Sequence, residues 1–89
     1  MRGLSIQVSS RKGRPFAAYI YLNRHLGQRA AKTEQVSSEV VVDYAADGRP
    51  IGIEIVTPEV VALDQIYEAF DRLGLGRPSP DDLKPLRAA

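Results

Sequence analysis

Two carboxylates in the middle of this chain are its best candidates for chemistry. Asp43 and Glu54 lie in two β-branched runs that are separated by one Asp-Gly pair. If the runs pair as a hairpin, both carboxylates lie on one face near Gly52, which has no side chain to fill the space between them. Two carboxylates that close can bind a cation or share a proton. The alternative, which we favour, is an exposed pair held by a Lys or Arg of a neighbouring strand.

Other residues of catalytic type give little support for an enzyme. His25 is the only histidine, and its loop from Asn23 to Gly27 contains no acid. A lone loop histidine is more often a solvated side chain than a general base or a ligand. The absence of cysteine excludes disulfides, thiolate catalysis and Cys-ligated zinc. We therefore expect no enzymatic activity, no cofactor and no metal, with Asp43 and Glu54 as weak metal candidates.

Charge is divided unequally along the chain. The net charge is +1, yet residues 1–33 contain seven bases and no acid, while residues 34–89 contain all eleven acids and five bases. Such asymmetry can mark a nucleic-acid surface, but it can equally be neutralised when both halves join one sheet, which we prefer. Tyr19 and Tyr21 beside basic residues do offer the combination that stacks bases on a sheet. The nucleic-acid candidates are Arg11, Lys12, Arg14 and Arg24.

Hydrophobic periodicity predicts three strands before the hairpin. Residues 4–9 alternate between apolar and polar, which is typical of a half-buried strand. Residues 16–22 form a second strand whose two faces are both substantially apolar. Residues 29–37 alternate only weakly and predict a short strand or an edge strand. With the hairpin over residues 40–56, these segments predict an antiparallel meander of five strands.

The hairpin fixes its own register, because a slip of one residue would move every side chain to the other face. A two-residue turn with positive φ at Asp47 and Gly48 keeps the apolar residues together. It places Tyr44 opposite Ile51, Val42 opposite Ile53 and Val40 opposite Ile55. A three-residue loop with a bulge at Gly48 would instead place Asp43 and Glu54 among the apolar residues. Burying an unpaired carboxylate is costly, so we expect the two-residue turn.

The period changes to that of a helix after Val56. Apolar residues then follow at spacings of three and four, which predicts an amphipathic helix of about three turns: Leu63, Ile66, Tyr67, Phe70 and Leu73. Thr57 and Pro58 are typical of a helix start, but Val60 and Val61 are poor helix formers. We therefore expect the regular helix to begin near Ala62 or Leu63. Gly74 or Gly76 should end it in a left-handed conformation.

A Pro-rich tail over residues 77–89 follows a single domain over residues 1–76. Ser79-Pro80-Asp81-Asp82 is typical of a helix start, with a Ser cap and an acid three residues later. Pro85 then limits the helix to less than two turns. Leu83 and Leu86 are the residues it can bury. The tail either folds back over its own core or docks on a partner.

One helix can cover only one side of a five-stranded sheet. The other side would expose Tyr19 and Tyr21 beside apolar neighbours, and such a surface suits a back-to-back homodimer. The candidate interaction residues are Tyr19, Tyr21, Val41, Val56, Leu83 and Leu86. No apolar run approaches the ~18 residues of a membrane span, and the N-terminus lacks a signal-peptide core. We therefore expect a cytoplasmic protein without a membrane partner.

Several segments resemble a known family. The residues that carry the resemblance are Ala18-Tyr19-Ile20-Tyr21-Leu22, Lys32-Thr33-Glu34, Val41-Val42-Asp43-Tyr44, Asp47-Gly48 and Ile51-Gly52-Ile53-Glu54-Ile55. They are similar to the bacterial domain-of-unknown-function family numbered 2283 over roughly residues 4–56. The resemblance implies no established enzymatic activity. It also implies an antitoxin-like role, because the genes of members commonly neighbour those of small ribonuclease-like toxins.

Together these observations predict an α+β protein with a five-stranded antiparallel sheet, one helix on one face and a short helical tail. The predicted function is a small non-enzymatic protein-interaction module, homodimeric and antitoxin-like, with a small toxin-like protein as partner. One alternative is a nucleic-acid-binding protein that uses the basic N-terminal half. A second alternative is a small-ligand or metal-binding domain at Asp43 and Glu54.

Overall fold

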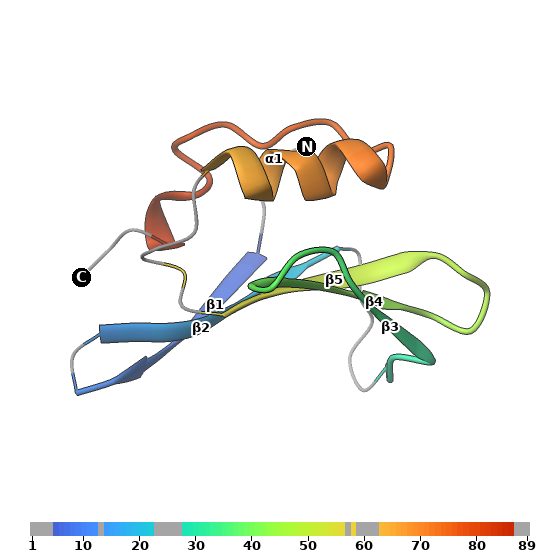
Figure 1. Cartoon of the computed structure of the whole chain (residues 1–89), viewed down its shortest axis with the longest axis horizontal. Helices are drawn as coiled ribbons and strands as arrows, with labels where there is room; N and C mark the ends of the chain where they lie inside the picture. Colours follow the sequence, from blue (N-terminus) through green and yellow to red (C-terminus); the bar gives the residue numbers. More distant parts are fainter. Residues whose placement is uncertain (1–4, 13, 23–27, 57, 59–62, 87–89) are drawn as a thin grey trace.

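Five strands form one antiparallel sheet, and a helix with the C-terminal segment covers one of its faces (Figure 1). The structure is a computed structural model that describes residues 5–12, 14–22, 28–56, 58 and 63–86, with the backbone alone at 11 and 14–16. The elements are β1 (Ser5–Arg11), β2 (Arg14–Tyr21), β3 (Lys32–Gln35), β4 (Val40–Tyr44), β5 (Pro50–Val56), helix α1 (Leu63–Arg72) and the 3-10 helix η1 (Lys84–Leu86). The predicted α+β class and the antiparallel five-stranded sheet are confirmed.

The order of the strands is β1-β2-β5-β4-β3, which differs from the predicted meander. β5 pairs with both β2 and β4 and lies at the centre of the sheet. The physical reason is burial: Ile51, Ile53 and Ile55 of β5 are fully buried, whereas all four residues of β3 are exposed. A meander would have placed β5 at an edge. Burying an Ile side chain stabilises the fold by about 1.5–3 kcal/mol, so the apolar strand takes the centre and the polar strand the edge.

The predicted register of the central hairpin is confirmed along most of β4. Residues 40–43 lie opposite residues 55–52, which keeps the carboxylates out of the apolar face. The pairing shifts at Tyr44, which lies opposite Pro50 and not opposite Ile51 as predicted. An extra residue in one strand of an antiparallel pair is a β-bulge. Because of this bulge, the pairing of residues 40–43 does not depend on the number of residues in the turn.

The turn of this hairpin has three residues, so the predicted two-residue turn is wrong. The loop 46–48 is closed by hydrogen bonds from Ala45 N to Arg49 O (2.8 Å) and from Gly48 N to Ala45 O (2.9 Å). Within the loop Gly48 alone has a positive φ, at 88°. Asp47 has no positive φ, and its Oδ1 accepts a hydrogen bond from Arg49 N (3.0 Å). The bulge reconciles this three-residue turn with the register that burial requires.

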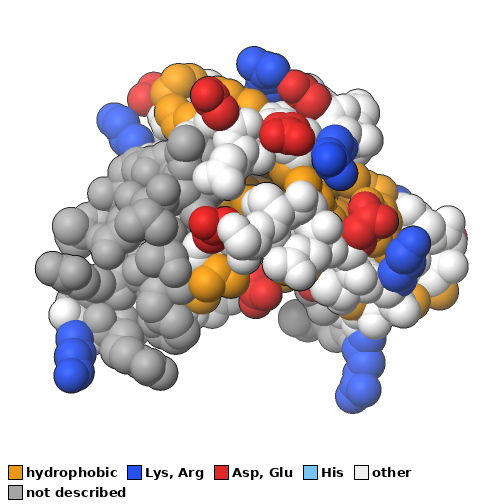
Figure 2. Space-filling view, in the orientation of Figure 1, with side chains coloured by type: hydrophobic (Ala, Val, Ile, Leu, Met, Phe, Trp, Pro, Cys, Tyr) orange, Lys and Arg blue, Asp and Glu red, His pale blue; other side chains and the backbone are white. Residues whose placement is uncertain are grey.

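Within the described residues helix α1 spans Leu63–Arg72, and Val60, Val61 and Ala62, on which the predicted helix start depends, lie outside the described residues. Ile66, Ala69 and Phe70 are fully buried against the sheet. The helix ends at Arg72, and Gly74 follows with a φ of 71°, which confirms the predicted left-handed residue at the helix stop. Leu75 N then donates to Phe70 O (3.0 Å), the hydrogen bond of a Schellman ending. Charged side chains of both signs lie on the outside of this layer (Figure 2).

The C-terminal segment folds back over the core of its own chain. Leu83 and Leu86 are both fully buried, in the same cluster as Ile53 and Phe70. The predicted cap is present, because Asp82 N donates to Ser79 Oγ and Ser79 N donates to Asp82 Oδ2, both at 3.2 Å. The tail that the sequence sets apart therefore supplies part of the core. Of the helices in the described residues, none has the length and apolar character needed to cross a membrane.

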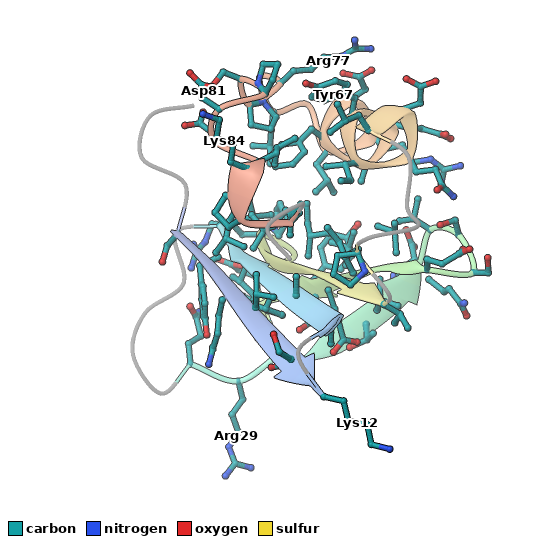
Figure 3. The ribbon with its side chains drawn as sticks, turned by 90° about the vertical axis from the view of Figure 1, so that its left-hand side faces the viewer. Lys12, Arg29, Tyr67, Arg77, Asp81 and Lys84 are labelled. Atoms are coloured by element: carbon teal, nitrogen blue, oxygen red, sulfur yellow. The ribbon has the colours of Figure 1, made fainter. Side chains whose placement is uncertain are left out.

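An exposed ion pair ties the start of this segment to α1. Arg77 donates from Nη2 to Asp71 Oδ2 (2.6 Å) and from Nε to Asp71 Oδ1 (3.1 Å), and its guanidinium lies 5.2 Å from the centre of the Tyr67 ring (Figure 3). The bidentate geometry holds the chain in place as it turns back over the sheet. The hydrogen bond from Arg77, followed by its charge, holds the pKa of Asp71 below its ordinary value of 3.8.

This lowered pKa predicts how stability depends on pH. A carboxyl whose pKa is lower in the folded state adds stability above its unfolded pKa and loses it as the pH falls through its folded pKa. The wild type should therefore be more stable than Asp71→Asn at pH 7, and this advantage should disappear below the ordinary range of Asp, about pH 4. Urea unfolding at several pH values measures the difference. An advantage that stays constant down to pH 2 would contradict the role given to Arg77.

Candidate functional site

We call the face of the sheet opposite α1 the open face. It carries three rows of side chains. No described helix covers this face (Figure 1). Paired residues of neighbouring strands form the rows. The first row is Gln7, Tyr19, Glu54, Val41 and Gln35; the second is Ser5, Tyr21, Gly52, Asp43 and Thr33; the third is Ser9, Ala17 and Val56. The predicted surface residues Tyr19, Tyr21, Val41 and Val56 thus lie together, whereas Leu83 and Leu86 are in the core.

The ring of Tyr19 lies directly over the backbone of Gly52. A methyl group added at Gly52 would come within 1.8 Å of the Tyr19 hydroxyl oxygen and 2.1 Å of the ring carbon that bears it. Gly52 has no positive φ, so space explains the glycine here and backbone conformation does not. A glycine inside a strand often marks such a close approach. The space that the sequence leaves between the carboxylates is therefore filled by a tyrosine from β2.

Asp43 anchors this tyrosine. Its Oδ2 accepts a hydrogen bond from the Tyr19 hydroxyl (2.9 Å), and its Oδ1 accepts one from Thr33 Oγ1 (2.9 Å). The three side chains come from β2, β4 and β3, and the first bond passes across β5 at Gly52. Hydrogen bonds to a carboxylate are stronger than those between neutral groups. Asp43 therefore fixes the position of an aromatic ring that is half-buried on the open face.

Tyr21 extends the arrangement to the other edge of the sheet. Its ring packs edge-to-face on Tyr19, with centroids 4.9 Å apart and an interplanar angle of 67°. Its hydroxyl donates to Gln7 Oε1 of β1 (2.8 Å). Contacts of this kind stabilise aromatic pairs beyond the burial of their surface. A chain of contacts therefore runs through all five strands and holds two tyrosines in defined orientations. We call it the tyrosine network: Gln7, Tyr21, Tyr19, Gly52, Asp43 and Thr33.

The structure brings the two candidate carboxylates to one face but gives them different surroundings. Asp43 uses both of its oxygens in the tyrosine network. Glu54 is exposed, and its carboxylate makes no ion pair or side-chain hydrogen bond within the described part of the chain. In the described residues no three His, Cys, Asp or Glu side chains gather in a way that fits a metal ion. The metal alternative stays a prediction, and the geometry favours a structural role for Asp43.

Described residues line hollows on both the open face and the hairpin end of the sheet. One, of about 130 Å³, is on the open face between Gln7, Ser9, Ala17, Ala18, Tyr19 and Glu54. The other, of about 440 Å³, lies at the hairpin end and is lined by Ala31, Lys32, Glu34, Tyr44, Ala45, Ala46 and Gly48. In the larger hollow, Lys32 Nζ lies 5.9 Å from the centre of the Tyr44 ring. Burial, and then the charge of Glu34, raises the pKa of the Tyr44 phenol above its ordinary value.

Comparison with known proteins supports a family resemblance across this site. Residues 17–57 match the family described as protein of unknown function (DUF2283). The resemblance to DUF2283 is therefore confirmed for this segment. No significant match was found among the curated proteins or among the solved structures. The matched segment contains most of β2 and all of β3, β4 and β5, so it includes Tyr19, Thr33, Asp43 and Gly52.

The basic candidates are only partly placed by the structure. Lys12 is exposed in the turn between β1 and β2, with a φ of 53°. Together with Arg29 it projects on the side of the sheet away from α1 (Figure 3). The side chains of Arg11 and Arg14 lie outside the described residues, as do Arg24 and His25. The residues that define the open face include two acids and no Lys or Arg, which disfavours a phosphate backbone across its centre.

The sequence pattern does not single out two members of the tyrosine network. Gln7 and Thr33 have no distinctive signal, because polar residues are expected on the outer face of a strand. The informative signal was Gly52, a glycine in an otherwise β-branched strand, which indicates that another group comes close. The identity of that group depends on the pairing of β2 with β5, which local sequence patterns do not reveal.

Proposed function

We propose that this chain is a small non-enzymatic protein-interaction module that binds a partner protein through its open face. The supporting observation is the tyrosine network, which holds Tyr19 and Tyr21 half-exposed and in fixed orientations before any partner binds. Tyrosine is enriched among the residues that dominate binding energy. A side chain that is already ordered loses little conformational entropy on binding.

Exposed apolar surface beside the tyrosines also supports the proposal. Val56 is 42% exposed, and Ala17 and Val41 are half-buried on the same face. Helix α1 and the C-terminal segment pack on the opposite face of the sheet, and these three residues are not part of the core cluster there. An exposed apolar patch with a polar rim is typical of a protein-binding surface.

Two specific partners follow from the sequence. The antitoxin-like role that the DUF2283 resemblance implies is one form of this proposal, with a small toxin-like protein as the partner. A second copy of the chain, forming a back-to-back homodimer, is the other form. Both remain predictions, as does a cytoplasmic location.

A matched pair of tyrosine variants tests the proposal. Tyr21 lies on the open face and Tyr67 on the helical layer, and both are half-buried. In affinity capture from the native host, Tyr21→Ala should lose the partner that the wild type retains, because it removes an ordered aromatic contact. Tyr67→Ala should retain it. Circular dichroism checks that both variants are folded. A partner that is kept by folded Tyr21→Ala and lost by folded Tyr67→Ala would contradict the proposal.

A further inference from the structure

We infer that the hollow on the open face receives a Lys or Arg side chain of a partner protein with a basic centre, an inference that rests on the proposed function. The hollow lies on the first row of the open face, where Tyr19 has Gln7 on one side and Glu54 on the other. These three residues come from three adjacent strands of one sheet. Their positions are therefore set by the ladder and not by a loop.

The chemistry of the lining fits a cation. Glu54 contributes an exposed carboxylate that no ion pair engages within the described residues. Tyr19 also lines the hollow, and its ring extends from there over Gly52. Cations bind over rings of this kind. Gln7 contributes an amide whose oxygen already accepts from Tyr21, which helps to hold the side chain in place. A carboxylate beside an ordered ring is a combination that binds an ammonium or guanidinium group by charge and by the ring together.

The size of the hollow limits what it can bind. Its volume of about 130 Å³ fits the end of one long side chain. Pockets for cofactors and drug-sized ligands are larger, about 300–1,000 Å³. A small free ligand would also leave the apolar part of the open face uncovered. The hollow therefore suits one anchoring side chain within a larger protein interface.

The distribution of charge indicates the kind of partner. The centre of the open face carries Asp43 and Glu54, while Lys12 and Arg29 project beyond it on the same side (Figure 3). The complementary partner has a basic centre with acids around it. A second copy of this chain has the opposite pattern, because its own centre is acidic. Stacking two copies face to face would bring their Glu54 carboxylates toward each other, which disfavours the homodimer on this face.

A titration followed by NMR tests the inference. The probe is N-acetyl-arginine amide, and the neutral control is N-acetyl-citrulline amide, which has nearly the same shape. The arginine probe should shift the amide signals of Gln7, Tyr19 and Glu54 and saturate in the millimolar range, while the citrulline probe should not. Glu54→Gln should weaken the binding about tenfold, because it removes the charge that faces the guanidinium. Asp64→Asn removes an equal charge from the exposed side of α1 and should change nothing.

The outcomes separate this inference from the proposed function. Equal shifts with both probes, or arginine shifts that Glu54→Gln leaves unchanged, would overturn the cation site even if Tyr21→Ala still loses its partner. A free chain that is dimeric by light scattering, and that Tyr21→Ala makes monomeric, would place a second copy on this face and would also overturn the inference. If arginine binding depends on Glu54 but Tyr21→Ala still captures the partner, the cation site is supported and the proposed function is contradicted.

Discussion

Leu83→Ala should lower the free energy of unfolding of the isolated chain by about 2–5 kcal/mol, the usual cost of truncating a buried leucine. Leu83 is fully buried in the cluster that also contains Ile66 and Phe70. For a domain of 60–100 residues each kcal/mol lowers Tm by about 4–8 °C, so a decrease of at least about 8 °C is expected. The loss is a large part of the total stability of an 89-residue chain, about 0.05–0.15 kcal/mol per residue.

Lys84→Ala is the matched control for this prediction. Lys84 follows Leu83 in the chain, is exposed, and forms a surface ion pair with Asp81 at 3.7 Å. Surface substitutions of this kind change stability by about 0.5 kcal/mol or less. Thermal unfolding of both purified variants gives the comparison. If Leu83→Ala were as stable as Lys84→Ala, the C-terminal segment would not belong to the core.

Gly52→Ala should also destabilise the protein, although alanine is normally the better residue in a strand. The new methyl group would lie 1.8 Å from the Tyr19 hydroxyl oxygen, so the ring must move and give up its hydrogen bond to Asp43. Overpacking typically costs about 1–3 kcal/mol, and a hydrogen bond to a charged group contributes about 1.5–3 kcal/mol. We expect a total loss of about 2–4 kcal/mol, because the tyrosine can partly relax toward solvent.

A double-mutant cycle with Tyr19→Ala tests the physical cause. The three atoms nearest to the new methyl group all belong to the Tyr19 ring, so without the ring Gly52→Ala should cost less than about 0.5 kcal/mol. The coupling between the two positions, measured by urea unfolding, should therefore be large. Equal costs of Gly52→Ala with and without the Tyr19 ring would show that the ring does not lie over Gly52.

Local patterns in the sequence predict most elements of this fold. The alternation in residues 4–9 and 16–22 and the spacing of Leu63, Ile66 and Phe70 correspond to β1, β2 and α1. The cost of burying carboxylates correctly predicts how residues 40–43 of β4 pair with β5. These features depend on residues that are close in the sequence or that share one face of one element. The local sequence pattern is therefore enough to predict them.

Strand order and the tyrosine network could not be predicted in this way. Both follow from the pairing of β2 with β5, which are separated by two other strands in the sequence. A meander would have placed Tyr19 beside β3 and away from Gly52. The three-residue turn differs from the predicted turn for a related reason. A β-bulge beside the turn lets a three-residue loop form while the apolar residues of both strands stay on the buried face. The path of the tail likewise depends on contacts between distant residues.

Hydroxyl-radical footprinting of the tyrosines, read by mass spectrometry, tests the central claim most directly. The chain contains its own control, since Tyr21 lies on the open face and Tyr67 on the helical layer. Oxidation is compared between the free chain and the chain captured with its partner from the native host. We predict that the partner lowers the oxidation of Tyr21 several-fold and leaves that of Tyr67 unchanged. Protection of Tyr67 with Tyr21 unchanged would contradict the assignment of the open face as the binding surface.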